Sequence, residues 1–419
     1  MKKVMAIVLA LMLAASLFAC GSPGASTTSP SASASASPSG SAPATTPSAT
    51  PGASGSTEVG YYDPSYDYSK NKNYKVAYVM ASTSVLYDQF SKAFKAWSDR
   101  ANVTYNDFSC NSDNDLFITT IQTYADQGYD GLLIDPDSTI YPRAVELCNE
   151  LKIPWMGCMS PALDDNGKMA HPYIGFDNYQ AGVAMSTYNT EYAKKTWPDA
   201  KPSEIGAIFI GYSVVPVLAE REKGYTDVFF KEFPDSAKNY YFCDGSVTGL
   251  MNAQVGYDLV SATVSAHADI KYWLISGFFD DYTDGAARAI DAAGKTATTV
   301  CSTFGGSGLI NQWDAGETGS AWRAAIYTDQ RLYAEPIFFG LYALMSGQAT
   351  PETLWPEWVN HKNGDTYASV LLPTVVITQD MYQQYLMWVQ EYTGIKQNDY
   401  DVAPGNYTSK VDVPDSYKA

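Results

Sequence analysis

Short apolar runs alternate with longer amphipathic segments over most of this chain. The apolar runs have the length and residue types of buried strands. The segments between them repeat apolar residues at helical spacing, as Leu86, Phe90 and Phe94 do after Ser84, a candidate N-cap. The pattern predicts strands at 75–81, 103–108, 131–134, 153–158, 205–211, 239–243, 272–276 and 298–302. It predicts helices at about 86–97, 117–124, 141–152, 217–232, 249–266 and 282–293.

Strands that alternate with helices are typical of parallel sheets with helices on both faces. The alternation breaks at Gly175-Phe176-Asp177-Asn178 and then resumes, so it forms two sets. We therefore predict an α/β protein with two parallel sheets. Ligands of such sheets bind beyond the carboxyl ends of the strands, and the residues after each strand are candidates for a site.

The first twenty residues have the pattern of an export signal. Lys2 and Lys3 precede an apolar stretch at 4–19, which ends in Leu17-Phe18-Ala19-Cys20. This ending resembles the lipobox of bacterial lipoproteins, and the resemblance implies that the Cys20 thiol is acylated and becomes the mature N-terminus. Two acyl chains suffice for stable anchoring to a membrane. The alternative is an ordinary secretory signal with an incidental cysteine.

A low-complexity segment follows the signal. Residues 21–57 contain only Ser, Thr, Pro, Ala and Gly, which cannot build a core, so we expect a disordered tether. A flexible chain of this length reaches roughly 35 Å. Residues 58–73 are rich in Tyr, Asp and Asn, and we expect them to form a loose lead-in.

Composition and charge exclude several classes of protein. The 419 residues carry a formal charge of −18, which argues against nucleic-acid binding and against electrostatic attachment to anionic lipid. The single long apolar run excludes a multi-span membrane protein. Three histidines without metal-like spacing, and no CxxC, argue against a metal site. Five further cysteines cannot be paired from sequence: Cys110, Cys148, Cys158, Cys243 and Cys301.

Several segments, taken in order, resemble a type I periplasmic binding protein of the ribose-binding-like branch. Gln127 to Pro136 resembles the family's segment that ends in Asn/Asp-Pro, and Arg221-Glu222-Lys223-Gly224-Tyr225 resembles its Arg-x-x-Gly-Phe segment. Asp280 to Ala286 resembles the Asn-Asp-x-x-Ala-x-Gly-Ala segment. Their order and spacing over roughly 300 residues make the resemblance specific, although no single segment is.

The resemblance implies two doubly wound parallel-sheet lobes, joined by a multi-strand hinge, with a ligand cleft between them. We expect the crossovers near Asp177, near 325–327 and within about 360–372. The implied organisation is a signal at 1–20, a tether and lead-in at 21–73, a first lobe at 74–176 with about 327–365, a second lobe at 177–326 with about 366–380, and a C-terminal helix and tail at 381–419.

The implied function is that of a lipid-anchored solute-binding protein on the extracytoplasmic face of the cell membrane. It would act as a monomer without a cofactor, capture a small sugar-like ligand and deliver it to an ABC permease. One alternative is a ligand sensor for a chemoreceptor or kinase. Another is a tethered glycoside hydrolase, with Asp135 and Asp280 as its carboxylate pair, although no local signature of an enzyme stands out.

A sugar ligand needs aromatic faces for its C–H groups and polar side chains for its hydroxyls. We expect the faces from Tyr87 and Phe279 and the polar contacts from Asp135, Asp280 and Arg221, whose guanidinium can fork onto two oxygens. The predicted ligand-binding set is completed by Ser84, Met159, Phe304 and Thr328.

Each of these residues also has a structural alternative. Tyr87, Asp135 and Asp280 could cap helices or form turns, Arg221 could pair with Glu220 or Glu222 at the surface, and Phe279 and Phe304 could be core. Asp280 to Gly285, with Asp291, faintly resembles a calcium loop. Gly305-Gly306-Ser307-Gly308 could hold an anion or form a turn with positive φ.

The chain departs from the sugar-binding pattern at three points. Met159-Ser160 stands where many sugar binders have Asp-Arg, Phe279 where they have Asn, and Phe304-Gly305-Gly306 where they have Phe-Asp-Gly. The family's fold is still implied, but these departures leave the identity of the ligand open.

Overall fold

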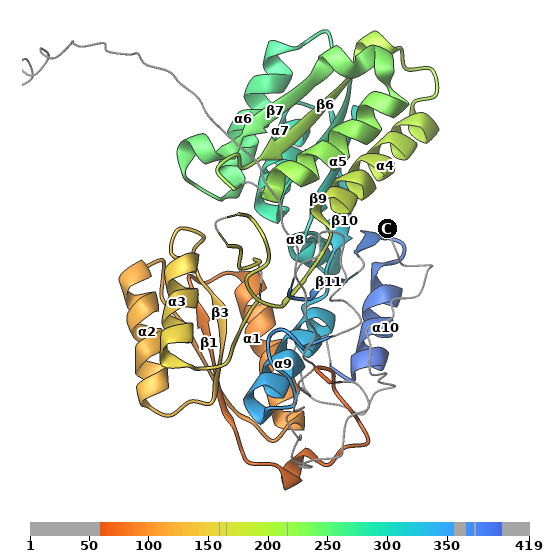
Figure 1. Cartoon of the computed structure of the whole chain (residues 1–419). Helices are drawn as coiled ribbons and strands as arrows, with labels where there is room; N and C mark the ends of the chain where they lie inside the picture. Colours follow the sequence, from red (N-terminus) through yellow and green to blue (C-terminus); the bar gives the residue numbers. More distant parts are fainter. Residues whose placement is uncertain are drawn as a thin grey trace, which may run out of the picture. The chain divides into compact units, whose positions relative to one another are not determined.

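A computed structural model of the chain describes residues 59–158, 160–164, 166–215, 217–355, 366–372 and 374–395 (Figure 1). Cys20, the tether at 21–57 and Met159 lie outside the described residues. Within the described ranges, no helix combines the length and apolarity that a membrane span requires.

The first sheet is parallel, and its strand order is β2-β1-β3-β4. Its strands are β1 (Lys75–Met80), β2 (Thr104–Ser109), β3 (Gly131–Asp135) and β4 (Trp155–Gly157). The helices in this part of the chain are α1 (Val85–Arg100), α2 (Asn114–Asp126) and α3 (Tyr141–Leu151). Alternate residues of β1 enter two cores, since Val76 and Tyr78 pack in the same core as Phe94, whereas Ala77 and Val79 pack with Phe117.

The second sheet has the strand order β12-β10-β9-β8-β6-β7. Its strands are β6 (Ile205–Gly211), β7 (Tyr240–Asp244), β8 (Tyr272–Gly277), β9 (Thr299–Phe304), β10 (Trp322–Tyr327) and β12 (Val375–Thr378). The helices are α4 (Asn178–Thr196), α5 (Val217–Glu232), α6 (Ala253–Ala266), α7 (Asp280–Ala292) and α8 (Ser307–Asp314). The sheet is parallel except at one edge, where β12 runs antiparallel to β10.

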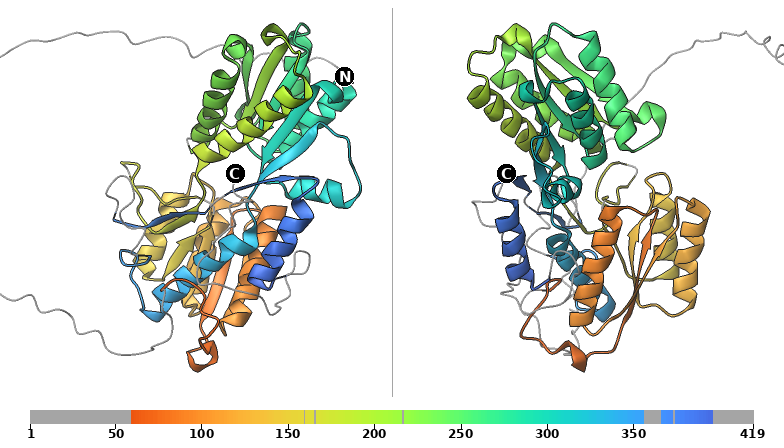
Figure 2. Two further views of the ribbon diagram at one scale, coloured as in Figure 1. Left: turned by 90° about the vertical axis from the view of Figure 1, so that its right-hand side faces the viewer. Right: turned by 180° about the vertical axis from the view of Figure 1, so that it is seen from behind.

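Three segments carry the chain between the two sheets. The two strands β5 (Tyr173–Gly175) and β11 (Ser369–Leu371) pair in parallel, and Asp177 then caps α4 of the second lobe. After β10, α9 (Gln330–Ser346) packs against α1 and against β3 and β4 of the first sheet, and α10 (Tyr382–Thr393) packs along α9 (Figure 2). The structure confirms the predicted mixed α/β class with parallel sheets.

A buried ion pair fixes the turn into α9. Asp329 caps the helix, and its two carboxylate oxygens accept hydrogen bonds from Nε and Nη2 of Arg331 at 2.9 and 2.7 Å. The remaining Nη1 of Arg331 donates to the carbonyl of Ile395 at 2.9 Å. The bidentate pair thereby also holds the segment after α10.

The lead-in that we expected to be loose is part of the fold. In this N-terminal segment (residues 59–73), Tyr61 and Tyr68 are buried. The indole N–H of Trp355 donates to the carbonyl of Gly60 at 3.2 Å, and the amide of Tyr62 donates to Glu335 of α9 at 2.6 Å. Its tyrosines are among the side chains that pack this segment onto the body. The short 3-10 helices are Tyr68–Lys70, Pro202–Glu204, Pro234–Asn239, Gly245–Thr248 and Thr296–Thr298.

Candidate functional site

Polar and aromatic side chains of the first lobe gather where β1 and β3 end. Asp135 is the last residue of β3 and is 4% exposed, and the hydroxyl of Tyr78 donates to its carboxylate at 3.0 Å. Tyr87 lies in the first turn of α1, and burial followed by the nearby charge of Asp135 raises the pKa of its phenol. Ser84 caps α1 by accepting the Tyr87 amide at 3.2 Å, so Tyr87 is not the capping residue.

Arg221 is the central cation of the second lobe. It lies on α5 and is 3% exposed, which contradicts the alternative of a surface pair with Glu220 or Glu222. Its Nη1 donates to the carbonyl of Phe278 and its Nη2 to the side-chain oxygen of Asn178, both at 2.5 Å. Burial lowers the pKa of Arg221 to about 9, and Tyr173 opposes that shift.

Two glycines bring Asn178 within reach of Arg221. Helices α4 and α5 approach so closely that a Cβ at Gly182 would overlap the carbonyl oxygen of Arg221. A Cβ at Gly224 would overlap the carbonyl oxygen of Tyr179. The backbone contact allowed by these two residues sets the position of the arginine.

An aromatic cluster surrounds the guanidinium. Phe304 ends β9, and the centre of its ring is 3.8 Å from the guanidinium carbon of Arg221. Phe176 follows β5, and its ring centre lies 4.4 Å from that of Phe304 and 6.2 Å from that of Tyr333 on α9. Phe176 and Tyr333 were missed as site residues from sequence. The only signal for Phe176 was its position in the Gly175-Phe176-Asp177-Asn178 crossover.

Two buried polar atoms of this cluster lack a partner. Among the described residues, neither Nε of Arg221 nor the hydroxyl of Tyr333 has a hydrogen-bond partner. Buried polar groups are normally satisfied, so such atoms point to a bound molecule or water. Burial raises the pKa of the Tyr173 phenol; the charge of Asp135 adds to this shift and the charge of Arg221 opposes it.

Asp280 is committed to the glycine-rich loop. Its carboxylate accepts the amides of Gly306 at 2.6 Å and Gly308 at 2.8 Å, at the start of α8. Gly305 and Gly306 have φ of 113° and 121°, so the loop is the turn with positive φ, and the anion it holds is Asp280. Burial raises the pKa of Asp280 to about 6, against those two hydrogen bonds.

The remaining predicted residues have clear positions. Residues 280–292 are helix α7, which contradicts a calcium loop there. Phe279 occupies the N-cap position of α7, and its ring packs against Phe278 and Tyr282. Thr328 follows β10 and is 8% exposed. The five cysteines of the body are all buried free thiols, and Cys158 lies close enough to Asp135 for that charge to raise its thiol pKa, after burial.

The first and second lobes also meet through α1 and α8. The hydroxyl of Ser307 donates to the side-chain oxygen of Gln89 at 3.1 Å. The structure places Asp135 and Tyr87 at the strand ends of the first lobe, places Arg221 with Phe304 in the second, and ties Asp280 to the α8 loop.

Two sheets with polar and aromatic side chains at the carboxyl ends of their strands define a two-lobed binding fold of the solute-binding class. The chain belongs to the family described as periplasmic binding protein domain, whose model matches residues 76–349. This match confirms the family resemblance seen in the sequence. No curated protein sequence matches the chain.

Solved structures share the fold at low sequence identity. A sugar-binding protein of a sugar ABC transporter from Bacillus halodurans has 15% identity and a TM-score of 0.58, with 75% of this chain and 100% of that chain covered. A 5-methylthioribose transporter solute-binding protein from Thermotoga lettingae has 18% identity and a TM-score of 0.56, with coverages of 75% and 88%. A solute-binding protein from Actinobacillus succinogenes with bound D-allose has 15% identity and a TM-score of 0.57, with coverages of 75% and 100%.

Proposed function

We propose that this chain captures a small sugar-like ligand outside the cytoplasm and delivers it to an ABC permease, without transforming it. The observation that carries the proposal is the cluster around Arg221. Among the described residues, the buried guanidinium stacked on Phe304 has no partner for its Nε. Phe176 packs on both Phe304 and Tyr333, and the hydroxyl of Tyr333 also has no partner within those residues. Together they offer hydrogen-bond donors beside an aromatic face.

A monosaccharide fits this chemistry. Its ring oxygens and hydroxyls would accept hydrogen bonds from Arg221 and Tyr333, and a C–H face would lie on Phe304 or Phe176. Asp135 would accept from a hydroxyl on the opposite edge. The D-allose and 5-methylthioribose bound by the similar structures support a ligand of this class.

The first experiment is a thermal-shift screen of the purified chain against pentoses, hexoses, sugar alcohols and nucleosides. We expect at least one sugar to raise the melting temperature, because a ligand that binds only the folded state stabilises it. The hit is then tested on Asp135→Asn, with Asp126→Asn on the exposed face of α2 as the matched control. If no sugar shifts the melting temperature, or if the hit shifts Asp135→Asn as much as the control, this site is wrong.

We also propose that Cys20 carries the membrane anchor. The thiol is the acyl acceptor, so Cys20→Ala should abolish incorporation of radiolabelled palmitate and release the chain from the membrane. Cys243→Ala, at a buried thiol of the body, should retain the label. Label in Cys20→Ala at the wild-type level would contradict the anchor.

The permease partner is proposed from the family and has its own test. The chain with its sugar hit bound, immobilised on beads, should retain ABC transporter subunits from detergent-solubilised membranes of the source cells. The unliganded chain should retain fewer, because docking is expected to favour the closed form. If the beads retain a chemoreceptor or kinase and no ABC transporter subunit, the sensor function is favoured.

A further inference from the structure

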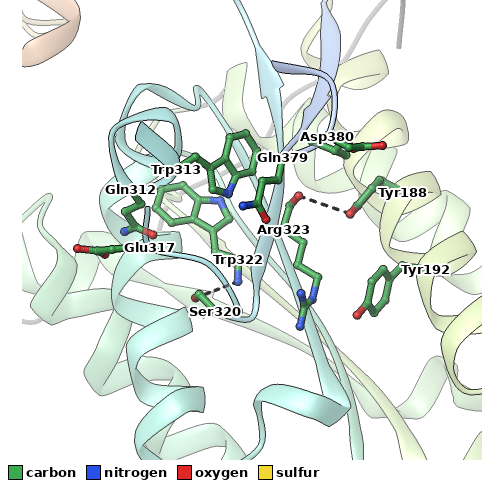
Figure 3. A pocket seen from close by; sticks show the side chains of 12 residues that line it. Tyr188, Tyr192, Gln312, Trp313, Glu317, Ser320, Trp322, Arg323, Gln379 and Asp380 are labelled. Atoms are coloured by element: carbon green, nitrogen blue, oxygen red, sulfur yellow. Dashed lines mark hydrogen bonds between the residues drawn. The ribbon is translucent and has the colours of Figure 1, made fainter. Parts of the chain in front are cut away.

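A pocket lies in the second lobe, at the opposite end of β10 from Thr328. It has a volume of about 450 Å³, within the range of small-molecule sites. Figure 3 shows α4 on one side of it, with Tyr188 and Tyr192, and Trp313 of α8 on the other. Trp322 and Arg323, the first two residues of β10, lie between them. The pocket shares no lining residue with the cluster around Arg221.

Two donors in this pocket are unsatisfied. Trp322 is 2% exposed, and its indole N–H has no hydrogen-bond partner among the described residues. The same holds for Nε of Arg323, which is buried although the residue as a whole is half-buried. Both atoms are hydrogen-bond donors, so a ligand that pairs with them must carry acceptor oxygens.

Charge favours an anionic acceptor. In the described ranges no ion pair joins Arg323 to a carboxylate, and its recorded side-chain contact is with the ring of Tyr192, at 5.4 Å from the ring centre. Asp380 and Glu317 also line the pocket, but both are exposed and extend away from the guanidinium (Figure 3). An arginine without a partner carboxylate matches the geometry of a ligand carboxylate, which it can bind with two hydrogen bonds.

The aromatic side chains of the pocket indicate which other groups the ligand carries. Trp313 and Trp322 are buried indoles, and the two tyrosines close the opposite wall, so a ring with an apolar face can stack inside. Gln379 and Asp380 at the rim offer polar partners for hydroxyl groups. A hydroxylated ring that bears one carboxylate would offer acceptor oxygens to the Arg323 guanidinium and an apolar face to the aromatic walls.

We propose that this pocket is a second binding site, for a sugar acid. The site goes beyond the proposed transport ligand and does not depend on it. A ligand bound across α4, α8, β10 and the residues after β12 would contact only the second lobe.

The experiment follows the tryptophan indole N–H signals of the full chain by NMR, with D-glucuronate as the probe and D-glucose as the neutral comparator. The Trp322 signal is assigned from its loss in Trp322→Phe. We expect D-glucuronate to shift the Trp322 signal in a saturable way and D-glucose to shift it much less. An unmoved Trp322 signal at millimolar D-glucuronate, or an equal response to D-glucose, would overturn the proposal.

The variants separate this pocket from the Arg221 site. Arg323→Gln should weaken D-glucuronate binding about tenfold or more, because a charge-assisted pair of hydrogen bonds is lost. Arg323→Lys keeps the charge without the fork and should lose less. Arg143→Gln, which removes an equivalent charge from exposed α3, is the matched control and should bind like the wild type. Wild-type affinity in both Arg323 variants would overturn the assignment, whereas loss of affinity in Arg221→Ala alone would place the ligand in the other site.

Discussion

Arg221 shows how one side chain can hold a structure together and still offer a ligand contact. A buried cation without a carboxylate is costly unless other groups compensate it. Here the Phe278 carbonyl, the Asn178 amide oxygen and the ring of Phe304 do so, and one N–H remains for a ligand.

We predict that Arg221→Ala lowers both affinity and stability. Affinity for the sugar hit should fall at least about tenfold, since hydrogen bonds to a charged group contribute about 1.5–3 kcal/mol. The melting temperature without ligand should fall as well, because the Phe278 carbonyl and Asn178 lose their donor. From sequence alone we would expect that temperature to hardly move. Calorimetry and unfolding on Arg221→Ala and on Arg143→Ala as control measure the two effects, and unchanged affinity in the folded fraction would remove Arg221 from the site.

His171 gives the chain a pH dependence on the acid side. The ring is 6% exposed, stacks on Trp155 at 3.8 Å between centres and contacts the Trp155 carbonyl through Nε2 at 2.8 Å. Burial lowers the pKa of His171 to about 4, while Trp155 and Glu352 oppose that shift.

A base whose pKa falls on folding binds its proton more weakly in the folded chain than in the unfolded one. Its contribution to stability is therefore complete above pH 6.5 and is lost as the pH falls toward 4. We predict that the wild type loses on the order of 3 kcal/mol more than His171→Gln between pH 7 and pH 4. Urea unfolding of both proteins at several pH values measures this, and parallel curves would contradict it.

At the residue scale, the sequence can predict a residue's place where position along a strand decides it. Asp135 and Phe304 end strands, so they reach the site edge wherever the sheet forms. Phe176 and Tyr333 could not be found in this way. Their positions depend on the pairing of β5 with β11 and on the return of α9 to the first lobe, which are contacts between distant parts of the chain.

At the scale of elements, helix α4 shows where the hydrophobic pattern fails. The hydrophobic pattern does not predict this helix, because its buried face consists largely of small and polar residues. These are Ala181, Gly182, Ala184, Ser186, Asn189, Thr190 and Ala193, with Met185 the one large apolar residue among them. Close packing of α4 against α5 requires small residues on the buried face of α4. The hydrophobic pattern of α4 is therefore weak although the two helices are in close contact. The strands and helices that were predicted lie within a few residues of their observed ends, whereas β10 and α9 were not among them.

We predict that Gly182→Ala disturbs the site from a distance. The added methyl would overlap the Arg221 carbonyl, so α4 must move away from α5 and Asn178 must retreat from the guanidinium. Stability should fall by about 1–3 kcal/mol, as for overpacking, and affinity for the sugar hit should fall with it. Gly294→Ala, at a positive-φ position with no atom near the new methyl, serves as the control for a destabilised chain with an intact site. Equal affinities in the two variants would show that the helix contact does not position Arg221.

For the whole molecule, the three crossovers are the natural pivots for a closing motion. Each is short, and the lobes have separate sheets. We propose that a ligand stabilises a closed form, in which Asp135 and Arg221 contact it together.

Small-angle scattering of the full chain, with and without a saturating concentration of the sugar hit, measures this closure. We predict a smaller radius of gyration with ligand, and a smaller change in Arg221→Ala at the same concentration. The same chain is used in both measurements, so the difference reports on the effect of the ligand. An unchanged radius with binding confirmed by calorimetry would exclude the motion.

The docking of residues 59–73 decides which half of the molecule is the fixed one. This segment is clamped by Trp355 and by Glu335 of α9, both on the first-lobe side of the crossovers. If Cys20 is acylated, a force transmitted from the membrane anchor acts on the contacts of residues 59–73 with Trp355 and Glu335. It does not act on the β5–β11 pair or on the turn at Asp177. In that case the second lobe is the one that moves relative to the membrane and to the proposed permease.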